Sequence, residues 1–258
     1  MNAVKLSPIR YFGGKTRAIS VIRPYFPCVK EFCSPFLGGA SLELSCANDG
    51  INVYGSDIFE PVVNFWIQVK KDAPGLADIA KSYLPLPKER FYTLRNEYED
   101  IKCKKEQAAV YFVLNRSSFS GLTFSGGMSP EHLRFTGSAI EDLRKFKAPN
   151  LHVELLDCYE ALEKHRGKFI YLDPPYANDE KLYGVKGSTH VNFDHVKLAE
   201  VLKTHEHWLL SYNDCELVRD LYKGYNIQKV FWSYGGLVKN KYEILVYSNK
   251  KFEKLLTF

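Results

Sequence analysis

Two short apolar segments near the N-terminus are separated by a glycine turn and a helical segment. Residues 28–36 predict a strand that runs into Gly38-Gly39, and residues 41–47 predict a helix. Residues 51–56 predict a second strand, which ends at Asp57. Strand, glycine turn, helix, strand and acid is the order of a Rossmann-like nucleotide-binding half. The sequence therefore predicts an α/β fold of this type.

After residue 66 the pattern changes twice along the chain. Segments with apolar residues at three- and four-residue spacing predict helices at 78–83, 88–101 and 104–114, and a loop rich in glycine and serine follows. From residue 148 onward, strand and helix patterns alternate again. We therefore expect one α/β core, residues 1–66 and 148–258, split by an inserted, mainly helical domain at residues 67–147.

The charge balance and the cysteine pattern limit which ligands and metal sites the chain can have. The chain carries 35 Lys and Arg against 30 Asp and Glu, a net charge of +5, which is compatible with a nucleic-acid ligand but shared by many enzymes. The six cysteines form no C-x-x-C pair and the histidines lack ligand spacing, so we expect free thiols and no metal. No leader and no apolar run of about 20 residues is present, which predicts a cytoplasmic protein.

The most informative segment is the apolar run 169–172 with the Asp173-Pro174-Pro175-Tyr176 that follows it. A strand here would deliver Asp173 to its carboxyl end, the edge where ligands bind in open α/β sheets. Two prolines fix the φ angles of the turn and remove two backbone donors, so the Pro174 carbonyl is held as an acceptor. Tyr176 adds an aromatic face beside both acceptors.

This set of groups suits a planar base with an exocyclic amine. Asp173 and the Pro174 carbonyl can each accept one amine hydrogen, which favours a tetrahedral nitrogen with its lone pair directed at a methyl donor. Tyr176 would stack on a base rotated out of a duplex. A plain Pro-Pro turn capped by an acid is the alternative, and the position directly after an apolar strand favours the functional interpretation.

Several motifs in a fixed order resemble the Dam family of adenine-N6 DNA methyltransferases. These are Tyr11-Phe12-Gly13-Gly14-Lys15, the segment 32–39 (F-x-x-P-F-x-G-G), the segment 111–122 and the tetrapeptide at 173–176. The order is that of the group in which the cofactor motif precedes the recognition domain and the catalytic tetrapeptide follows it. The resemblance implies S-adenosylmethionine as cofactor and the N6 amine of a flipped-out adenine in double-stranded DNA as target, with Asp173, Pro174 and Tyr176 as catalytic residues.

The resemblance also implies a cofactor pocket. Tyr11 and Lys15 match positions that contact S-adenosylmethionine, and Lys15 is suited to pair with its amino acid carboxylate. The segment 32–39 matches the cofactor loop and contributes Phe36, and Gly38 and Gly39 would allow a tight turn under the methionine part.

Acids complete the predicted pocket. Asp57 is suited to accept both ribose hydroxyls, with Phe59 and Pro61 flanking the adenine ring. Asp157 matches the acid that accepts a hydrogen bond from the adenine amine, or else caps the helix that begins at residue 158. The resemblance further implies that Asp173 contacts both the cofactor and the target base.

Segment 111–122 corresponds to the start of the loop that approaches DNA in relatives. Arg116 and Arg134 are candidates for phosphate or guanine contacts, and Asn115 for an adenine edge or, equally, a structural turn. Lys239 and Lys241 are candidates for phosphate contacts. Residues 123–130 depart from the family's usual continuation, so the resemblance does not extend to a G-A-T-C target.

Two alternatives stay open at this point. A methyltransferase acting on RNA adenine or on cytosine N4 would keep the cofactor pocket and change the base pocket. A DNA-binding module of the same fold without catalysis would not need Lys15, Asp57 or the tetrapeptide. Under the main interpretation we expect a monomer acting on DNA, either alone or beside a cognate restriction endonuclease in a restriction-modification system.

Overall fold

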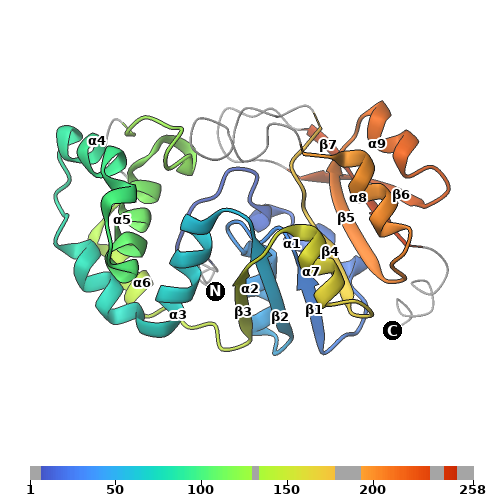
Figure 1. Ribbon diagram of the computed structural model, residues 1–258, viewed down its shortest axis with the longest axis horizontal. Helices are drawn as coiled ribbons and strands as arrows, with labels where there is room; N and C mark the ends of the chain where they lie inside the picture. Colours follow the sequence, from blue (N-terminus) through green and yellow to red (C-terminus); the bar gives the residue numbers. More distant parts are fainter. Residues whose placement is uncertain (1–6, 130–133, 178–192, 233–240, 249–258) are drawn as a thin grey trace.

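The computed structural model describes residues 7–129, 134–177, 193–232 and 241–248, and a seven-stranded sheet forms its centre (Figure 1). The strand order is β3-β2-β1-β4-β5-β7-β6, in which β7 runs antiparallel to β5 and β6 and the remaining pairs are parallel. The strands are β1 Glu31–Ser34, β2 Asn52–Asp57, β3 Leu151–Leu155, β4 Phe169–Leu172, β5 Trp208–Asn213, β6 Asn226–Trp232 and β7 Lys241–Tyr247. The predicted Rossmann-like α/β class is confirmed.

The central strands β1 and β4 are buried on both faces of the sheet. Successive side chains of a strand point to opposite faces. Phe32 and Phe169 accordingly enter one hydrophobic cluster, whereas Cys33 and Ile170 enter another. The first cluster contains residues of α1 (Ile19–Ile22), α2 (Ser41–Asn48) and α3 (Glu60–Lys81), and the second contains residues of α7 (Cys158–Lys164), α8 (His195–Leu202) and α9 (Glu216–Leu221).

The predicted helical insert consists of long helices that pack on one another at one end of the molecule (Figure 1). They are α3, α4 (Lys88–Asn96), α5 (Lys104–Ser117) and α6 (Gly137–Arg144). The predicted helix at 78–83 is the last part of α3, and that at 88–101 is α4 followed by a short 3₁₀ turn at Tyr98–Asp100.

The predicted boundary at residue 67 falls inside α3. This helix starts directly after β2, packs against β2 and β3, and continues into contact with α5 and α6. Its backbone leaves helical geometry only at Asp72 (φ −156°, ψ 75°). Buried residues of the sheet and of the helices form one continuous cluster, so the helical part and the sheet share a core.

Three broader expectations concern the whole chain. Among the described residues, no helix is both long and apolar enough to cross a membrane, and no group of three His, Cys, Asp or Glu side chains gathers as metal ligands would. All six cysteines are free thiols.

The shared core yields a prediction about cooperativity. Phe65 in α3 is fully buried and stacks parallel to Phe112 of α5, at a centroid distance of 6.3 Å. We expect Phe65→Ala to lower the free energy of unfolding by about 3 to 5 kcal/mol, and Phe119→Ala, at an exposed position, to change it by less than about 0.5 kcal/mol.

Urea unfolding followed by circular dichroism and tryptophan fluorescence should show one coincident transition. Two separate transitions would show that the helices and the sheet fold independently.

Candidate active site

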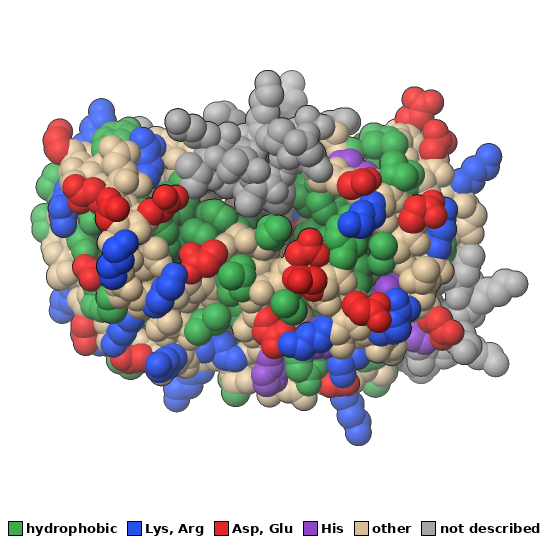
Figure 2. Space-filling view, in the orientation of Figure 1, with side chains coloured by type: hydrophobic (Ala, Val, Ile, Leu, Met, Phe, Trp, Pro, Cys, Tyr) green, Lys and Arg blue, Asp and Glu red, His purple; other side chains and the backbone are tan. Residues whose placement is uncertain are grey.

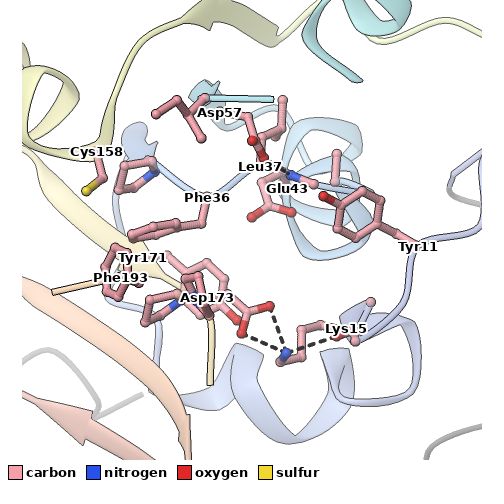
Figure 3. Close-up of a pocket in the computed structure, with 18 of the residues that line it drawn as sticks. Tyr11, Lys15, Phe36, Leu37, Glu43, Asp57, Cys158, Tyr171, Asp173 and Phe193 are labelled. Atoms are coloured by element: carbon pink, nitrogen blue, oxygen red, sulfur yellow. Dashed lines mark hydrogen bonds and ion pairs between the residues drawn. The ribbon is translucent and has the colours of Figure 1, made fainter. Parts of the chain in front are cut away.

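A cavity of about 360 Å³ lies at the edge of the sheet where β1, β2 and β4 end (Figure 3). The direction in which the parallel strands are wound reverses between β1 and β4, and ligands of open α/β sheets bind at such a point. The volume is in the range of small-molecule sites. Aromatic and acidic side chains dominate the lining, among them Tyr11, Phe36, Tyr171, Phe193, Glu43, Asp57, Asp157 and Asp173.

Asp173 follows β4 and holds an ion pair with Lys15 across the cavity (Figure 3). The Lys15 ammonium lies 2.7 Å from each carboxylate oxygen and also donates to the Gly13 carbonyl at 3.0 Å. Ser211 of β5 donates its hydroxyl to the same carboxylate at 3.0 Å. Lys15 is 5% exposed, and an ion pair this buried needs such additional hydrogen bonds to offset its desolvation.

The other two members of the tetrapeptide are also fixed. The Tyr176 hydroxyl donates to Glu243, a buried acid of β7, and the Lys15 ammonium lies 5.1 Å from the centre of the Tyr176 ring. Pro174 is buried at the cavity wall, and of the residues that the structure describes none donates a hydrogen bond to its carbonyl. Two acceptors and one aromatic ring therefore lie together, as the sequence predicted.

The glycine turn after β1 packs closely against Tyr11. A Cβ atom on Gly38 would lie 2.7 Å from the Tyr11 ring, and one on Gly39 would lie 2.5 Å from the Tyr11 Cβ. Gly38 also has a positive φ of 44°, which favours glycine. Of these two glycines only Gly38 lines the cavity. The turn thus makes room for Tyr11, which in turn forms part of the cavity wall.

Asp57 ends β2 and faces the cavity. Its two oxygens accept the backbone N–H groups of Gly38 and Phe59, each at 2.9 Å. Burial raises the pKa of Asp57, and these backbone donors partly oppose the rise. Each carboxylate oxygen keeps a second lone pair. Ile58, rather than Phe59 or Pro61, lines the cavity beside it, because the Phe59 ring packs edge-on against Phe124.

Both interpretations of Asp157 fit its position. One oxygen accepts the Tyr159 and Glu160 N–H groups at 2.7 and 3.3 Å, and the Glu160 side chain accepts the Asp157 N–H, which is a complete capping box for α7. Asp157 and the neighbouring Cys158 also line the cavity. The cap holds the carboxylate in place and leaves its second oxygen without a partner among the described residues.

Three polar groups of the site were not predicted. Ser211 lies on β5, which pairs with β4, and Glu243 lies on β7, which pairs with β5, so both reach the tetrapeptide through strand pairing rather than through a local motif. Glu43 is different: it is the one acid in α2, a helix whose residues are otherwise apolar, small or polar and uncharged. Burial raises the pKa of Glu43 to about 7, and a hydrogen bond from Ser34 at 2.7 Å opposes the rise.

The predicted DNA-binding residues differ in where the structure places them. Asn115 is fully buried, accepts the Arg10 N–H at 2.8 Å and donates to the carbonyls of Arg10 and Gly121 and to Thr123. An adenine-edge contact by Asn115 is therefore corrected to the structural alternative, because its amide is already satisfied. Lys239 lies outside the described residues, and Lys241 begins β7, its side chain lying outside them.

Three arginines gather beside Asn115. Arg116 donates through Nε to the Arg134 carbonyl at 2.9 Å. Burial, together with the charges of Arg10 and Arg134, lowers the pKa of Arg116 to about 10. The sequence predicted Arg116 and Arg134 but missed Arg10, whose proximity depends on the backbone contact to Asn115.

Comparisons with known proteins agree with this geometry. The family model of D12 class N6 adenine-specific DNA methyltransferases matches residues 11–235. Type II methyltransferase M1.LlaDCHI of Lactococcus lactis subsp. cremoris is 26% identical over 256 residues, which cover 89% of each chain. The DNA N-6-adenine-methyltransferase of Escherichia phage P1 is 23% identical over 87% of this chain and 32% of its own length, so the chain spans about a third of that protein.

Among solved structures, the precorrin-6y C5,15-methyltransferase of Geobacter metallireducens GS-15 matches 90% of this chain and 87% of its own, with a TM-score of 0.38 and 11% identity, a likeness too weak to carry an argument. The family model covers most of the chain, including the cavity and the tetrapeptide. The resemblance predicted from the sequence motifs is confirmed. This chain belongs to the D12 class N6 adenine-specific DNA methyltransferases.

Proposed function

We propose that this protein transfers a methyl group from S-adenosylmethionine to N6 of an adenine flipped out of double-stranded DNA at a specific site. The observation that carries the proposal is the pair of acceptors at the cavity wall. The Asp173 carboxylate is held from two sides by Lys15 and Ser211, and the Pro174 carbonyl beside it has no donor among the described residues. An exocyclic amine with two N–H groups matches these acceptors.

The lining of the cavity fits the proposed cofactor. Asp57 and Asp157 keep carboxylate lone pairs at the ends of β2 and β3, where ribose hydroxyls and an adenine amine find acceptors. Phe36 adds an apolar surface to the cavity, and Tyr11 and Lys15 lie on the side opposite Phe36 and Cys158 (Figure 3). When bound, S-adenosylmethionine supplies an activated methyl group on a positively charged sulfur.

The protein's own groups favour the reaction by position and charge. Asp173 and Pro174 accept the two N6 hydrogens, which turns the nitrogen lone pair out of the ring plane and toward the cavity. Methyl transfer forms a C–N bond, breaks a C–S bond and leaves a positive charge on N6 until a proton departs. The Asp173 carboxylate is placed to stabilise this developing charge, and Lys15 and Ser211 hold it in that orientation.

Tyr176 is suited to receive the flipped base. Its hydroxyl is tied to Glu243 and its ring is tilted against Tyr212 at a centroid distance of 5.9 Å. A ring fixed in this way offers a face for stacking at little cost in conformational freedom.

Arg116 and Arg134, two of the proposed DNA contacts, lie in the helical insert, residues 67–147, which we propose to be the recognition domain. On the face drawn in Figure 2, acidic and basic side chains are intermixed, so no broad field of one sign marks the DNA path there. Arg10, Arg116 and Arg134 provide a local positive charge instead. A phosphate bound between them would relieve their mutual repulsion. Action as a monomer in the cytoplasm, either alone or beside a cognate restriction endonuclease, belongs to the same proposal.

Asp173→Ala should abolish methylation, because it removes one of the two acceptors for the target amine. We expect a loss of at least about 10² to 10³-fold in turnover, measured as transfer of label from S-adenosylmethionine to duplex DNA, with cofactor binding still measurable by calorimetry. Asp214→Ala is a matched control, since Asp214 follows the neighbouring β5 but pairs with Arg219 outside the cavity. Retained activity in Asp173→Ala, or label found on cytosine, would contradict the assignment.

Arg116→Ala should weaken DNA binding by about the same factor for every duplex sequence. Removing one arginine–phosphate interaction lowers the slope of log affinity against log salt by about 1. Fluorescence anisotropy at several salt concentrations measures this slope. Arg116→Lys keeps the charge and should restore most of the wild-type slope. Arg166→Ala, which breaks a surface ion pair with Glu163 on α7, should leave the slope unchanged. A slope that is equal in Arg116→Ala and the wild type would exclude the phosphate contact.

A further inference from the structure

Glu43 places an acidic group in the cavity that the reaction proposed above does not use. It is 4% exposed, lies in α2 between the buried Leu42 and Leu44, and lines the cavity. In Figure 3 its carboxylate points into the cavity, on the side where Asp173 and Lys15 lie. A buried acid that faces a cavity is retained at a cost in stability unless something compensates for its charge.

The protein itself compensates for this charge only in part. Ser34 is the one described side chain that donates a hydrogen bond to Glu43, at 2.7 Å to one oxygen, and a backbone hydrogen bond from Glu43 itself also lowers its pKa. Lys15 is near enough to lower the pKa of Glu43, but its ammonium is bound to Asp173 and the Gly13 carbonyl. The nearby Asp173 charge acts in the opposite direction. Burial dominates the balance and raises the pKa to about 7.

We propose that Glu43 binds the α-ammonium group at the amino acid end of S-adenosylmethionine. This inference rests on the proposed function and names a cofactor-binding residue that the sequence motifs did not indicate. Asp57 and Asp157 lie at the strand ends proposed for the nucleoside, which leaves the side formed by Tyr11, Lys15 and Glu43 for the amino acid.

S-adenosylmethionine carries two cationic groups, the α-ammonium and the sulfonium, and their hydrogen-bonding capacity decides which of them Glu43 binds. An ammonium group carries N–H donors that can satisfy the second carboxylate oxygen of Glu43, whereas a sulfonium has no donor. The sulfonium must also lie where its methyl group faces the target amine beside Asp173.

A binding cycle without DNA tests the proposal. Calorimetry compares S-adenosylhomocysteine with S-adenosyl-4-thiobutyrate, which lacks only the α-amino group, on the full-length wild type and on Glu43→Gln. A charge-assisted hydrogen bond predicts that the wild type binds the amino compound at least about tenfold more tightly. In Glu43→Gln this preference should fall to about threefold or less, with the affinity for S-adenosyl-4-thiobutyrate nearly unchanged. Glu31→Gln removes a carboxylate that pairs with Lys168 outside the cavity and should keep the preference.

Each result has a defined meaning. A wild type that binds both compounds equally, or a Glu43→Gln variant that keeps the full preference, overturns the role of Glu43. An equal loss of affinity for both compounds in Glu43→Gln also overturns it, because it indicates a general change of the pocket. A wild type that binds neither compound contradicts the proposed function itself, so the two failures are distinguishable.

The same variant gives a pH-dependent prediction for stability. The folded pKa of Glu43 is about 7 and the ordinary value is 4.5, so the folded state binds this proton more tightly and loses stability as the pH rises from 4.5 to 7. Glu43→Gln removes this loss. We expect its thermal midpoint without ligand to equal that of the wild type near pH 4.5 and to exceed it at pH 8. A midpoint below the wild type at pH 8 would show that Glu43 has a stabilising structural role.

Discussion

The ion pair between Lys15 and Asp173 is the constraint on which the rest of the site depends. It joins the N-terminal segment to the end of the central strand β4, across 158 positions of sequence. Tyr11 and Lys15 belong to one short turn that packs on Gly38, so the ion pair ties this turn, and the part of the cavity wall formed by Tyr11, to Asp173. The same ion pair also brings the Lys15 ammonium close to the Tyr176 ring.

Local patterns predicted the parts of the site that local structure determines. Asp57 and Asp173 could be placed because an acid at the carboxyl end of an apolar strand must lie at one edge of a parallel sheet. The reason for Gly38-Gly39 could not be found, because it is the Tyr11 ring, which approaches from elsewhere in the chain. Glu243 and Ser211 reach the tetrapeptide through strand pairing, and their register is a property of the whole sheet. The predicted domain boundary at residue 67 falls within α3 for a related reason: the 3.6-residue pattern of α3 does not record which partner each turn packs against.

The acids of the cavity differ in how completely the protein satisfies them. Asp57 is bound by two backbone N–H groups and Asp157 by a capping box, so each is positioned by secondary structure before any ligand binds. Glu43 has a single side-chain donor and remains costly to ionise. The fold itself positions Asp57 and Asp157, whereas the charge of Glu43 requires a ligand to balance it fully. Functional groups commonly reduce stability in this way.

The continuity of α3 affects how target specificity can be exchanged between relatives. The Trp66 side chain, in the part of this helix that packs on the sheet, donates its indole N–H to the Gly38 carbonyl at 2.9 Å. The first turns of α3 therefore support the glycine turn proposed to hold the cofactor, although they lie next to the helices proposed to read DNA. A chimaera joined at residue 67 would divide this support between two parents. A joint at Asp72, where the helical geometry is already interrupted, would exchange the helices proposed to read DNA. It would keep Trp66 and the Gly38 turn that it supports from the same parent.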